Sequence, residues 1–145
     1  MRALIQRVAH ARVEVAGRLV GSIGRGLLVF LAVQRGDDSA RARAMAARLL
    51  AYRVFADAEG RMNLDVREAG GGVLLVSQFT LAADTSRGLR PSFSGAAEPS
   101  IAREIYEETL RALREQHAGI ACGEFGADMQ VSLQNDGPVT FLLEL

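Results

Sequence analysis

GGGVLLVSQFTL, residues 70–81, is the stretch around which the chain is organised. Three glycines break the preceding structure, four apolar residues follow at 73–76, and the segment turns polar at Ser77. A short apolar run bounded in this way is typical of a β-strand that is buried on both faces. A second run of this kind, LLVFLAV at 27–33, predicts another such strand.

Shorter runs on either side predict further sheet. Strands of alternating or β-branched residues are predicted at 4–8, 12–15, 19–23, 129–134 and 139–145. Ala16-Gly17 is a hairpin-turn signal, and Asn135-Asp-Gly-Pro138, between the last two strands, is another. Val54-Phe55 and the residues after it predict a strand end followed by a turn.

Two helices are spaced among these strands. The first is predicted over 40–53, after the acidic and capping residues 37–39, and the second runs from Pro99 to Gly119. Their apolar faces consist of Met45, Leu49 and Tyr52 in the first helix and Ile101, Ile105, Leu110 and Leu113 in the second. The predicted fold is a single α+β domain over residues 1–145, with a mostly antiparallel sheet that curls toward a barrel.

Composition narrows the function classes. The 145 residues are 49% hydrophobic and 23% charged, as in one globular domain. The formal net charge is zero, which excludes a protein that gathers nucleic acid by overall positive charge and leaves a local basic patch open. All 17 basic side chains are Arg, so a Schiff-base lysine and a Walker-type lysine are excluded.

The sequence lacks the usual signals for metals, cofactors and membranes. Its single cysteine, Cys122, excludes an intramolecular disulfide and is expected to be a small buried hydrophobe. No HExxH, EF-hand, Walker A or GxGxxG pattern occurs, so we expect neither a metal nor a cofactor. The apolar runs are too short for a bilayer and the start does not resemble a signal peptide, which predicts a cytoplasmic protein. His10 and His117 are expected at the surface.

The polar end of the strand at 73–79 is the first candidate site. A rigid strand delivers Ser77, Gln78 and Thr80 to a surface there. Hydroxyls, an amide and unpaired backbone N–H groups suit a carbonyl oxygen that is becoming negative. The alternative is an ordinary strand end in which Ser77 and Thr80 bond to nearby backbone. The residues alone leave both interpretations open.

Pro138 marks a second candidate. It removes a backbone donor at the start of a predicted strand and permits a cis bond to Gly137, which would aim backbone carbonyls outward in a fixed direction. An ordinary hairpin turn is the alternative.

The loop at 84–99 is a third candidate. It carries Arg87 and Arg90 with several hydroxyl side chains, and no acidic residue lies between Asp84 and Glu98. Such a loop either contacts phosphates or is simply solvated.

Six stretches in order resemble the bacterial D-aminoacyl-tRNA deacylases across the whole chain. They are Ile5-Gln-Arg-Val8, Met62-Asn-Leu64, Ser77-Gln-Phe-Thr-Leu81, Arg90-Pro-Ser-Phe93, Gly123-Glu-Phe-Gly-Ala-Asp-Met-Gln-Val131 and Asn135-Asp-Gly-Pro-Val-Thr140. Ala82 departs from the pattern, because many relatives have Tyr there. The resemblance implies a homodimeric hydrolase that cleaves the ester between a D-amino acid, or glycine, and the terminal adenosine of tRNA. We expect tRNA and a second copy of the chain as partners, and neither DNA nor a membrane.

The resemblance also implies roles for individual residues. It implies a catalytic role for Ser77, Gln78, Phe79 and Thr80. It implies that the terminal adenosine is bound by Phe125, Gly126, Ala127 and Met129, and that tRNA phosphates are contacted by Arg87 and Arg90. Gly137-Pro138, in cis, is implied to reach into the other subunit's pocket and to exclude an L-side chain. Arg7 resembles the position that holds this segment in its orientation.

The nucleophile is open between protein and substrate. Thr80 has no base near it in sequence, and an unactivated threonine is a poor nucleophile at neutral pH. The 2′-hydroxyl of the terminal ribose lies beside the ester and can help to activate water instead, so we favour this route. Two rival classes are a module that binds adenosine or RNA without chemistry and a small-molecule esterase with Thr80 or Ser77 as nucleophile.

Overall fold

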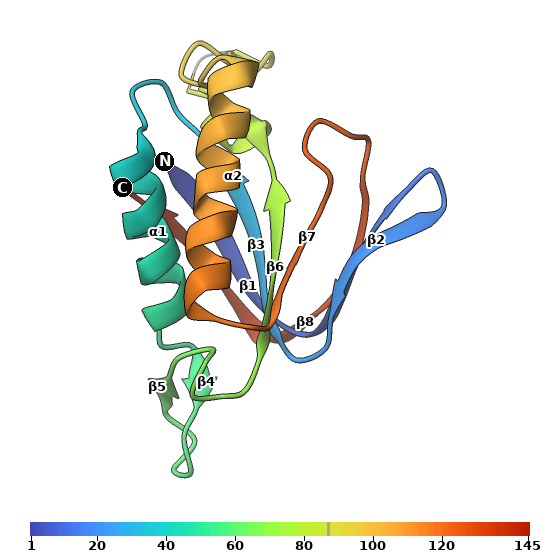
Figure 1. Ribbon diagram of the computed structural model, residues 1–145, viewed down its shortest axis with the longest axis vertical. Helices are drawn as coiled ribbons and strands as arrows, with labels where there is room; N and C mark the ends of the chain where they lie inside the picture. The colour runs from blue at the N-terminus through green and yellow to red at the C-terminus, as the bar shows by residue number, and fades with distance from the viewer. Residues whose placement is uncertain (87) are drawn as a thin grey trace.

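Six strands form the main sheet of the computed structural model, which describes residues 1–86 and 88–145 (Figure 1). These strands are β1 (Arg2–Val15), β2 (Arg18–Ile23), β3 (Gly26–Ala32), β6 (Gly72–Ser77), β7 (Ile120–Cys122) and β8 (Gln130–Glu144). The other elements are α1 (Ser39–Ala51), a small hairpin of β4 (Phe55–Ala56) and β5 (Met62–Leu64), the short 3₁₀ helix η1 (Phe79–Ala82) and α2 (Pro99–Gln116).

The sheet is mixed, which corrects the expectation of a mostly antiparallel one. β1 pairs antiparallel with β2, β3 and β8, whereas β3–β6 and β6–β7 are parallel pairs. The helices explain the difference, because α1 lies in the connection from β3 to β6 and α2 in the connection from β6 to β7. A helix returns the chain to the starting end of a sheet, and the next strand then runs parallel to the last.

The structure corrects two breaks that the sequence predicts between strands, because β1 and β8 each run on where a break was expected. β1 continues through 4–15 without interruption, and β8 continues through the expected hairpin turn at 135–138. Both halves of β8 pair with β1, as Val131 opposite Val13 and Phe141 opposite Ile5. Because the two flanks share one neighbour, the chain does not reverse, and the extra residues form a bulge where the register shifts. The Ala16-Gly17 hairpin turn is confirmed, with φ of 49° and 76°.

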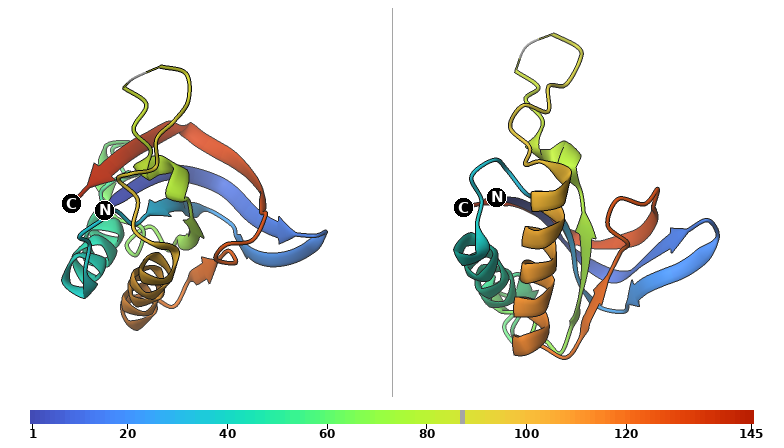
Figure 2. Two further views of the ribbon diagram at one scale, coloured as in Figure 1. Left: turned by 90° about the horizontal axis from the view of Figure 1, so that it is seen from above. Right: turned by 45° about the horizontal axis from the view of Figure 1, so that its top comes forward.

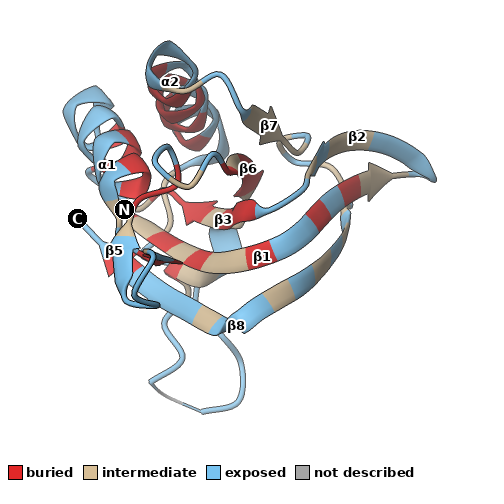
Figure 3. Ribbon diagram, turned by 90° about the horizontal axis from the view of Figure 1, so that it is seen from below, coloured by how far each residue is buried: buried red, intermediate tan, exposed pale blue. Residues whose placement is uncertain are grey.

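The sheet curls into a nearly closed barrel. β2 and β7 lie at opposite ends of the strand order of this strongly curled sheet (Figure 2). Even so, Gly21 of β2 lies against Cys122 of β7. A Cβ atom at Gly21 would stand only 2.4 Å from the Cys122 carbonyl oxygen. The two helices cover one outer face of this curled sheet, and β8 lies exposed along another side (Figure 3).

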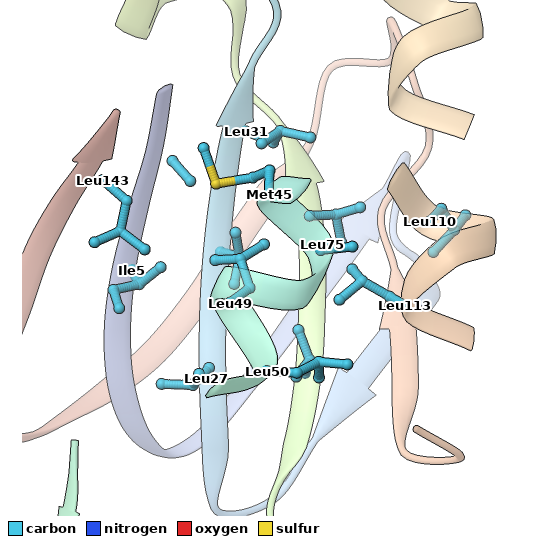
Figure 4. Close-up of a cluster of buried hydrophobic side chains, with 14 of the residues drawn as sticks. Ile5, Leu27, Leu31, Met45, Leu49, Leu50, Leu75, Leu110, Leu113 and Leu143 are labelled. Atoms are coloured by element: carbon cyan, nitrogen blue, oxygen red, sulfur yellow. The ribbon is translucent and has the colours of Figure 1, made fainter. Parts of the chain in front are cut away.

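Two clusters of buried side chains explain the uninterrupted apolar runs. Leu75 of β6 and Leu27 of β3 point toward the helices, where Leu49 of α1 meets them (Figure 4). The intervening residues, Leu28 and Leu74, point the other way into the curl of the sheet. Both central strands are therefore buried on both faces, as the sequence predicts.

Both predicted helices are confirmed, with one correction to their apolar faces. Asp38 caps α1 by accepting a hydrogen bond from the Arg41 backbone N–H at 2.9 Å. Ile101 is 48% exposed, although it was expected in the buried stripe of α2. The buried face of that helix instead includes Ala102, Ile105 and Tyr106, so Ile101 lies off to its side. Among the described residues, no helix is both long and apolar enough to cross a membrane.

Gly26→Ala is expected to destabilise the fold severely. A Cβ atom at Gly26 would lie 2.0 Å from the carbonyl oxygen of Gly72, its partner in the parallel β3–β6 pair. Backbone must move to admit it, at a cost of about 3 kcal/mol or more in the free energy of unfolding. Urea unfolding measures this cost. Gly24→Ala is the matched control, since nothing lies within 4 Å of its added Cβ, and equal stabilities for the two variants would contradict the prediction.

Candidate active site

A cavity of about 480 Å³ opens beside the carboxyl ends of β3 and β6. Its other walls come from the start of α2 and from the segment that joins β7 to β8. The lining consists of Leu31, Val33, Val76, Ser77, Gln78, Phe79, Ala96, Ala97, Pro99, Ala102, Tyr106, Phe125, Gly126, Ala127, Asp128, Met129 and Val131. A cavity of this size and mostly apolar lining suits a small ligand or one nucleoside.

The cavity brings together two stretches that lie far apart in the sequence. Seven of the predicted site residues line it, namely Ser77, Gln78, Phe79, Phe125, Gly126, Ala127 and Met129. Other predicted residues stand outside the lining, namely Thr80, Arg7, Gly137, Pro138 and Arg90. The prediction for Arg87 falls outside the described residues. The fold therefore joins the polar strand end to the FGADM segment in one site.

The polar end of β6 is held rigidly. The Gln78 backbone N–H donates to the Leu31 carbonyl at 2.8 Å, which fixes the exit of the strand, and η1 begins at the next residue. The first N–H groups of a helix have no partner within it. In the part of the chain that the structure describes, neither the Phe79 nor the Thr80 N–H donates to another backbone group. This strand end thus offers two N–H donors beside the cavity that have no backbone partner among the described residues.

Among the residues that the structure describes, Thr80 has no base in hydrogen-bonding contact. The Thr80 hydroxyl oxygen accepts a hydrogen bond from the side-chain amide of Gln78, a group that cannot take up a proton at neutral pH. His10 is exposed on β1, as expected. His117 is half-buried, and its Nε2 lies 2.8 Å from the Gly71 carbonyl oxygen. Neither histidine is hydrogen-bonded to Thr80, so this arrangement lacks the nucleophile–base pair of a hydroxyl hydrolase.

Phe125 forms an aromatic wall of the cavity. Its ring centroid is 5.5 Å from that of Tyr106, and the Arg103 guanidinium lies over the ring at 4.7 Å. The Tyr106 hydroxyl donates to the Leu75 carbonyl at 3.0 Å, which ties this wall to β6. Burial raises the pKa of Tyr106, so its hydroxyl stays protonated at neutral pH and serves as a donor.

Arg7 is bonded to the segment that carries Gly137. The Arg7 Nε donates to the Asp136 carbonyl oxygen at 3.1 Å and also lies 3.1 Å from the Asp136 carboxylate. The Arg7 Nη1 donates to the Val54 carbonyl at 2.6 Å. The peptide bond between Gly137 and Pro138 is cis, and both residues are exposed. Arg7 thus fastens the bulge of β8 to the chain before β4.

Several lining residues were missed by sequence reasoning. Tyr106 and Asp128 line the cavity, and neither was singled out. Tyr106 had a usable signal, since an aromatic residue with a polar tip lies next to Ile105 on an apolar helix face. Cys122, expected to be buried, is half-buried at the end of β7, where the Arg114 guanidinium lies 3.6 Å from its sulfur.

The sequence of this chain is similar to one family of known proteins over nearly its whole length. The family model described as D-Tyr-tRNA(Tyr) deacylase matches residues 4–144. A D-aminoacyl-tRNA deacylase of Stutzerimonas stutzeri (strain A1501) is 61% identical over 144 residues, covering 99% of both chains. One from Pseudomonas putida (strain GB-1) is 57% identical over 145 residues, covering 100% of both.

Two solved structures resemble the fold. A c-Myc DNA Unwinding Element Binding Protein superposes with a TM-score of 0.95 at 38% identity, covering 100% of this chain and 99% of that one. A probable eukaryotic D-amino acid tRNA deacylase superposes with a TM-score of 0.85 at 16% identity, covering 99% and 98%. At 16% identity the second likeness concerns the fold alone.

Proposed function

This chain belongs to the D-Tyr-tRNA(Tyr) deacylase family, and we propose that the cavity beside β6 is where it cleaves the ester of a D-aminoacyl-tRNA. Its activity is that of a D-aminoacyl-tRNA deacylase, a hydrolase acting on the ester bond of aminoacyl-tRNA. The products are a free amino acid and tRNA. The observation that carries the placement is that residues 77–79 and residues 125–129 line the same cavity.

The terminal adenosine occupies the end of the cavity formed by Phe125, Gly126, Ala127 and Met129. A flat aromatic ring and a polarisable thioether suit the face of a base. The small residues at 126 and 127 let a ligand approach the backbone closely. With the base placed there, the ester of the same nucleoside reaches the other end of the cavity, where Ser77, Gln78 and Phe79 line the wall.

Hydrolysis uses the substrate's own hydroxyl. Water attacks the ester carbonyl with help from the 2′-hydroxyl of the terminal ribose, and the 3′-oxygen leaves with a proton. The unpaired N–H groups of Phe79 and Thr80 stabilise the oxyanion. Support for this route comes from Thr80 itself, whose hydroxyl is bonded to an amide and not to a base.

Stereochemical selection requires a second copy of the chain. Gly137 and Pro138 are exposed and do not line the cavity of their own chain, so a partner is needed to bring them to a cavity. Exposed Phe141 and Leu142 on the same strand, β8, support a homodimer interface near this segment. Backbone from the partner excludes an L-side chain and ignores the identity of a D-side chain, so glycine is also accepted.

The rest of the tRNA is contacted without reading its sequence. Arg90 and Arg87 meet acceptor-end phosphates, which supports action on many tRNAs. The site of action is the cytoplasm, where aminoacyl-tRNA is made and used. No metal or cofactor takes part in this scheme.

Hydrolysis of paired D- and L-tyrosyl-tRNA tests the proposal. We expect the purified protein to release tyrosine rapidly from the D-ester, with an L-ester rate at least about 100-fold lower, because the filter acts on the position of the side chain. Radiolabelled tyrosine release measures both rates. Turnover of neither ester with tRNA still bound would favour the binding module, and a trapped acyl-enzyme on Thr80 or Ser77 would favour the esterase.

A further inference from the structure

Two phenylalanines form an exposed aromatic pair at the mouth of the cavity. The ring centroids of Phe79 and Phe93 lie 5.2 Å apart, with the planes inclined by 53°. Phe79 is 61% exposed and Phe93 is 41% exposed. Phe79 lines the cavity, whereas Phe93 stands outside its lining. The pair therefore continues the cavity wall outward onto the surface.

The backbone that carries Phe93 is fixed at the base of its loop. Asp84 and Ser92 exchange two backbone hydrogen bonds, of 2.7 and 3.0 Å, that close this base. The Ala96 N–H donates to the Phe93 carbonyl at 3.0 Å, and Ala96 also bridges to Gln34 after β3. The described chain on either side of residue 87 extends beyond the end of the sheet (Figure 2). Phe93 lies at the anchored base, between Ser92, which bonds to Asp84, and Ala96, which donates to the Phe93 carbonyl. A backbone that is already fixed loses little freedom when the side chain it carries is covered by a ligand.

The charge around the pair suits an anion. Residues 85–97 contain no acidic side chain, and the Asp84 carboxylate at their start already accepts the Ser86 N–H at 2.9 Å. Arg90, three residues before Phe93, is exposed and forms no ion pair with the residues that the structure describes. Exposed aromatic faces on a segment that also carries an exposed cation are a pattern found in single-stranded nucleic-acid contacts.

We propose that Phe79 and Phe93 form a stacking subsite for the nucleotide that precedes the terminal adenosine of tRNA. This inference rests on the proposed function, which puts the adenosine in the adjoining cavity. The 3′ end of tRNA is single-stranded, so its bases are free to unstack from one another and lie on protein aromatics. The phosphate between the two nucleotides then lies within the positively charged surroundings of Arg90. Stacking reads no base edge, which fits an enzyme that must accept many tRNAs.

Binding of short nucleotides tests the subsite without requiring turnover. Calorimetry is used to measure the Kd of adenosine and of the trinucleotide CpCpA with the full-length protein. Phe93→Ala is expected to weaken CpCpA binding by about fivefold or more, the effect of losing one stacked base, and to leave adenosine binding unchanged. Phe93→Tyr keeps the ring and restores CpCpA affinity. Leu89→Ala, a fully exposed apolar side chain on the same loop, is the matched control and changes neither Kd.

Other outcomes overturn the subsite. An equal loss for adenosine and CpCpA would give Phe93 a purely structural role, and no loss for either would remove it from the contact surface. Light scattering measures the molar mass of the Phe93→Ala variant and of the wild type. A lower molar mass for the variant, with unchanged CpCpA binding, would show that the pair is instead covered by a second copy of the chain. Ester hydrolysis is measured separately, so failure of the proposed activity is distinguishable from failure of the subsite.

Discussion

D-tyrosyl-tRNA with a 2′-deoxy terminal ribose is expected to be hydrolysed about 10²- to 10⁴-fold more slowly than the normal substrate, the usual range for loss of a proton-transfer group. Thr80→Ala, by contrast, is expected to keep the single-turnover rate within about tenfold of the wild type, the scale of one neutral hydrogen bond. The contrast follows from the site, where the Thr80 hydroxyl is hydrogen-bonded to the Gln78 amide and to no base among the described residues. Substrate and protein changes thus separate the two routes.

Single-turnover rates at saturating protein measure this contrast, since they exclude product release. Binding of uncharged tRNA with a 2′-deoxy end is the control, and it should match that of normal tRNA. The substrate-assisted route fails if folded, tRNA-binding Thr80→Ala is nearly inactive while the deoxy substrate is cleaved at the normal rate. That result would favour the alternative of a small-molecule esterase, with Thr80 as the covalent nucleophile.

Gly137→Ala is expected to lower kcat/KM for the D-ester by about 100-fold and to reduce the D-to-L preference. Gly137 has a φ of +132°, which L-residues with a side chain rarely adopt. Its added Cβ would also stand 2.9 Å from the Arg7 guanidinium and 2.7 Å from the Val139 side chain. The segment must shift, and a displacement of about 1 Å in a positioning group costs rates of this order.

Gly17→Ala is the matched control for Gly137→Ala. Gly17 also has a positive φ, of +76°, but nothing lies within 4 Å of its added Cβ, and it sits in the β1–β2 turn. Its replacement should reduce stability without changing the D-to-L ratio of rates. Stereoselectivity that stays intact in a folded Gly137→Ala protein would contradict a role for the Gly-Pro segment in chiral selection.

Residues that interact locally were predictable from the sequence. The helix at α1 follows from an Asp cap and apolar residues spaced by three and four, of which Met45 and Leu49 are fully buried. The buried strands follow from apolar runs such as 73–76, because a strand covered on both faces has no polar side. The prediction of a site for the terminal adenosine of tRNA came from sequence motifs. Each motif is weak alone, but their order along the chain matches one family.

Pairing between distant segments was not predictable in the same way. Asn135-Asp-Gly-Pro138 has the local chemistry of a hairpin turn, yet both of its flanks pair with β1 and the chain continues. The direction of β6 and β7 depends on where the helices return the chain. Local preferences of about 1 kcal/mol cannot outweigh a long ladder of hydrogen bonds and buried side chains.

The sequence by itself determined that this protein is one α+β domain, where its two helices and its buried central strands lie, and which family it resembles, since these depend on local periodicity and on motif identity. Only the tertiary structure decided that Ser77 and Phe125 share one cavity, that Tyr106 supports its wall and that Phe93 meets Phe79 at its mouth. Such contacts join residues far apart in the chain, and they are fixed by how the curled sheet and its two helices bury their apolar faces together.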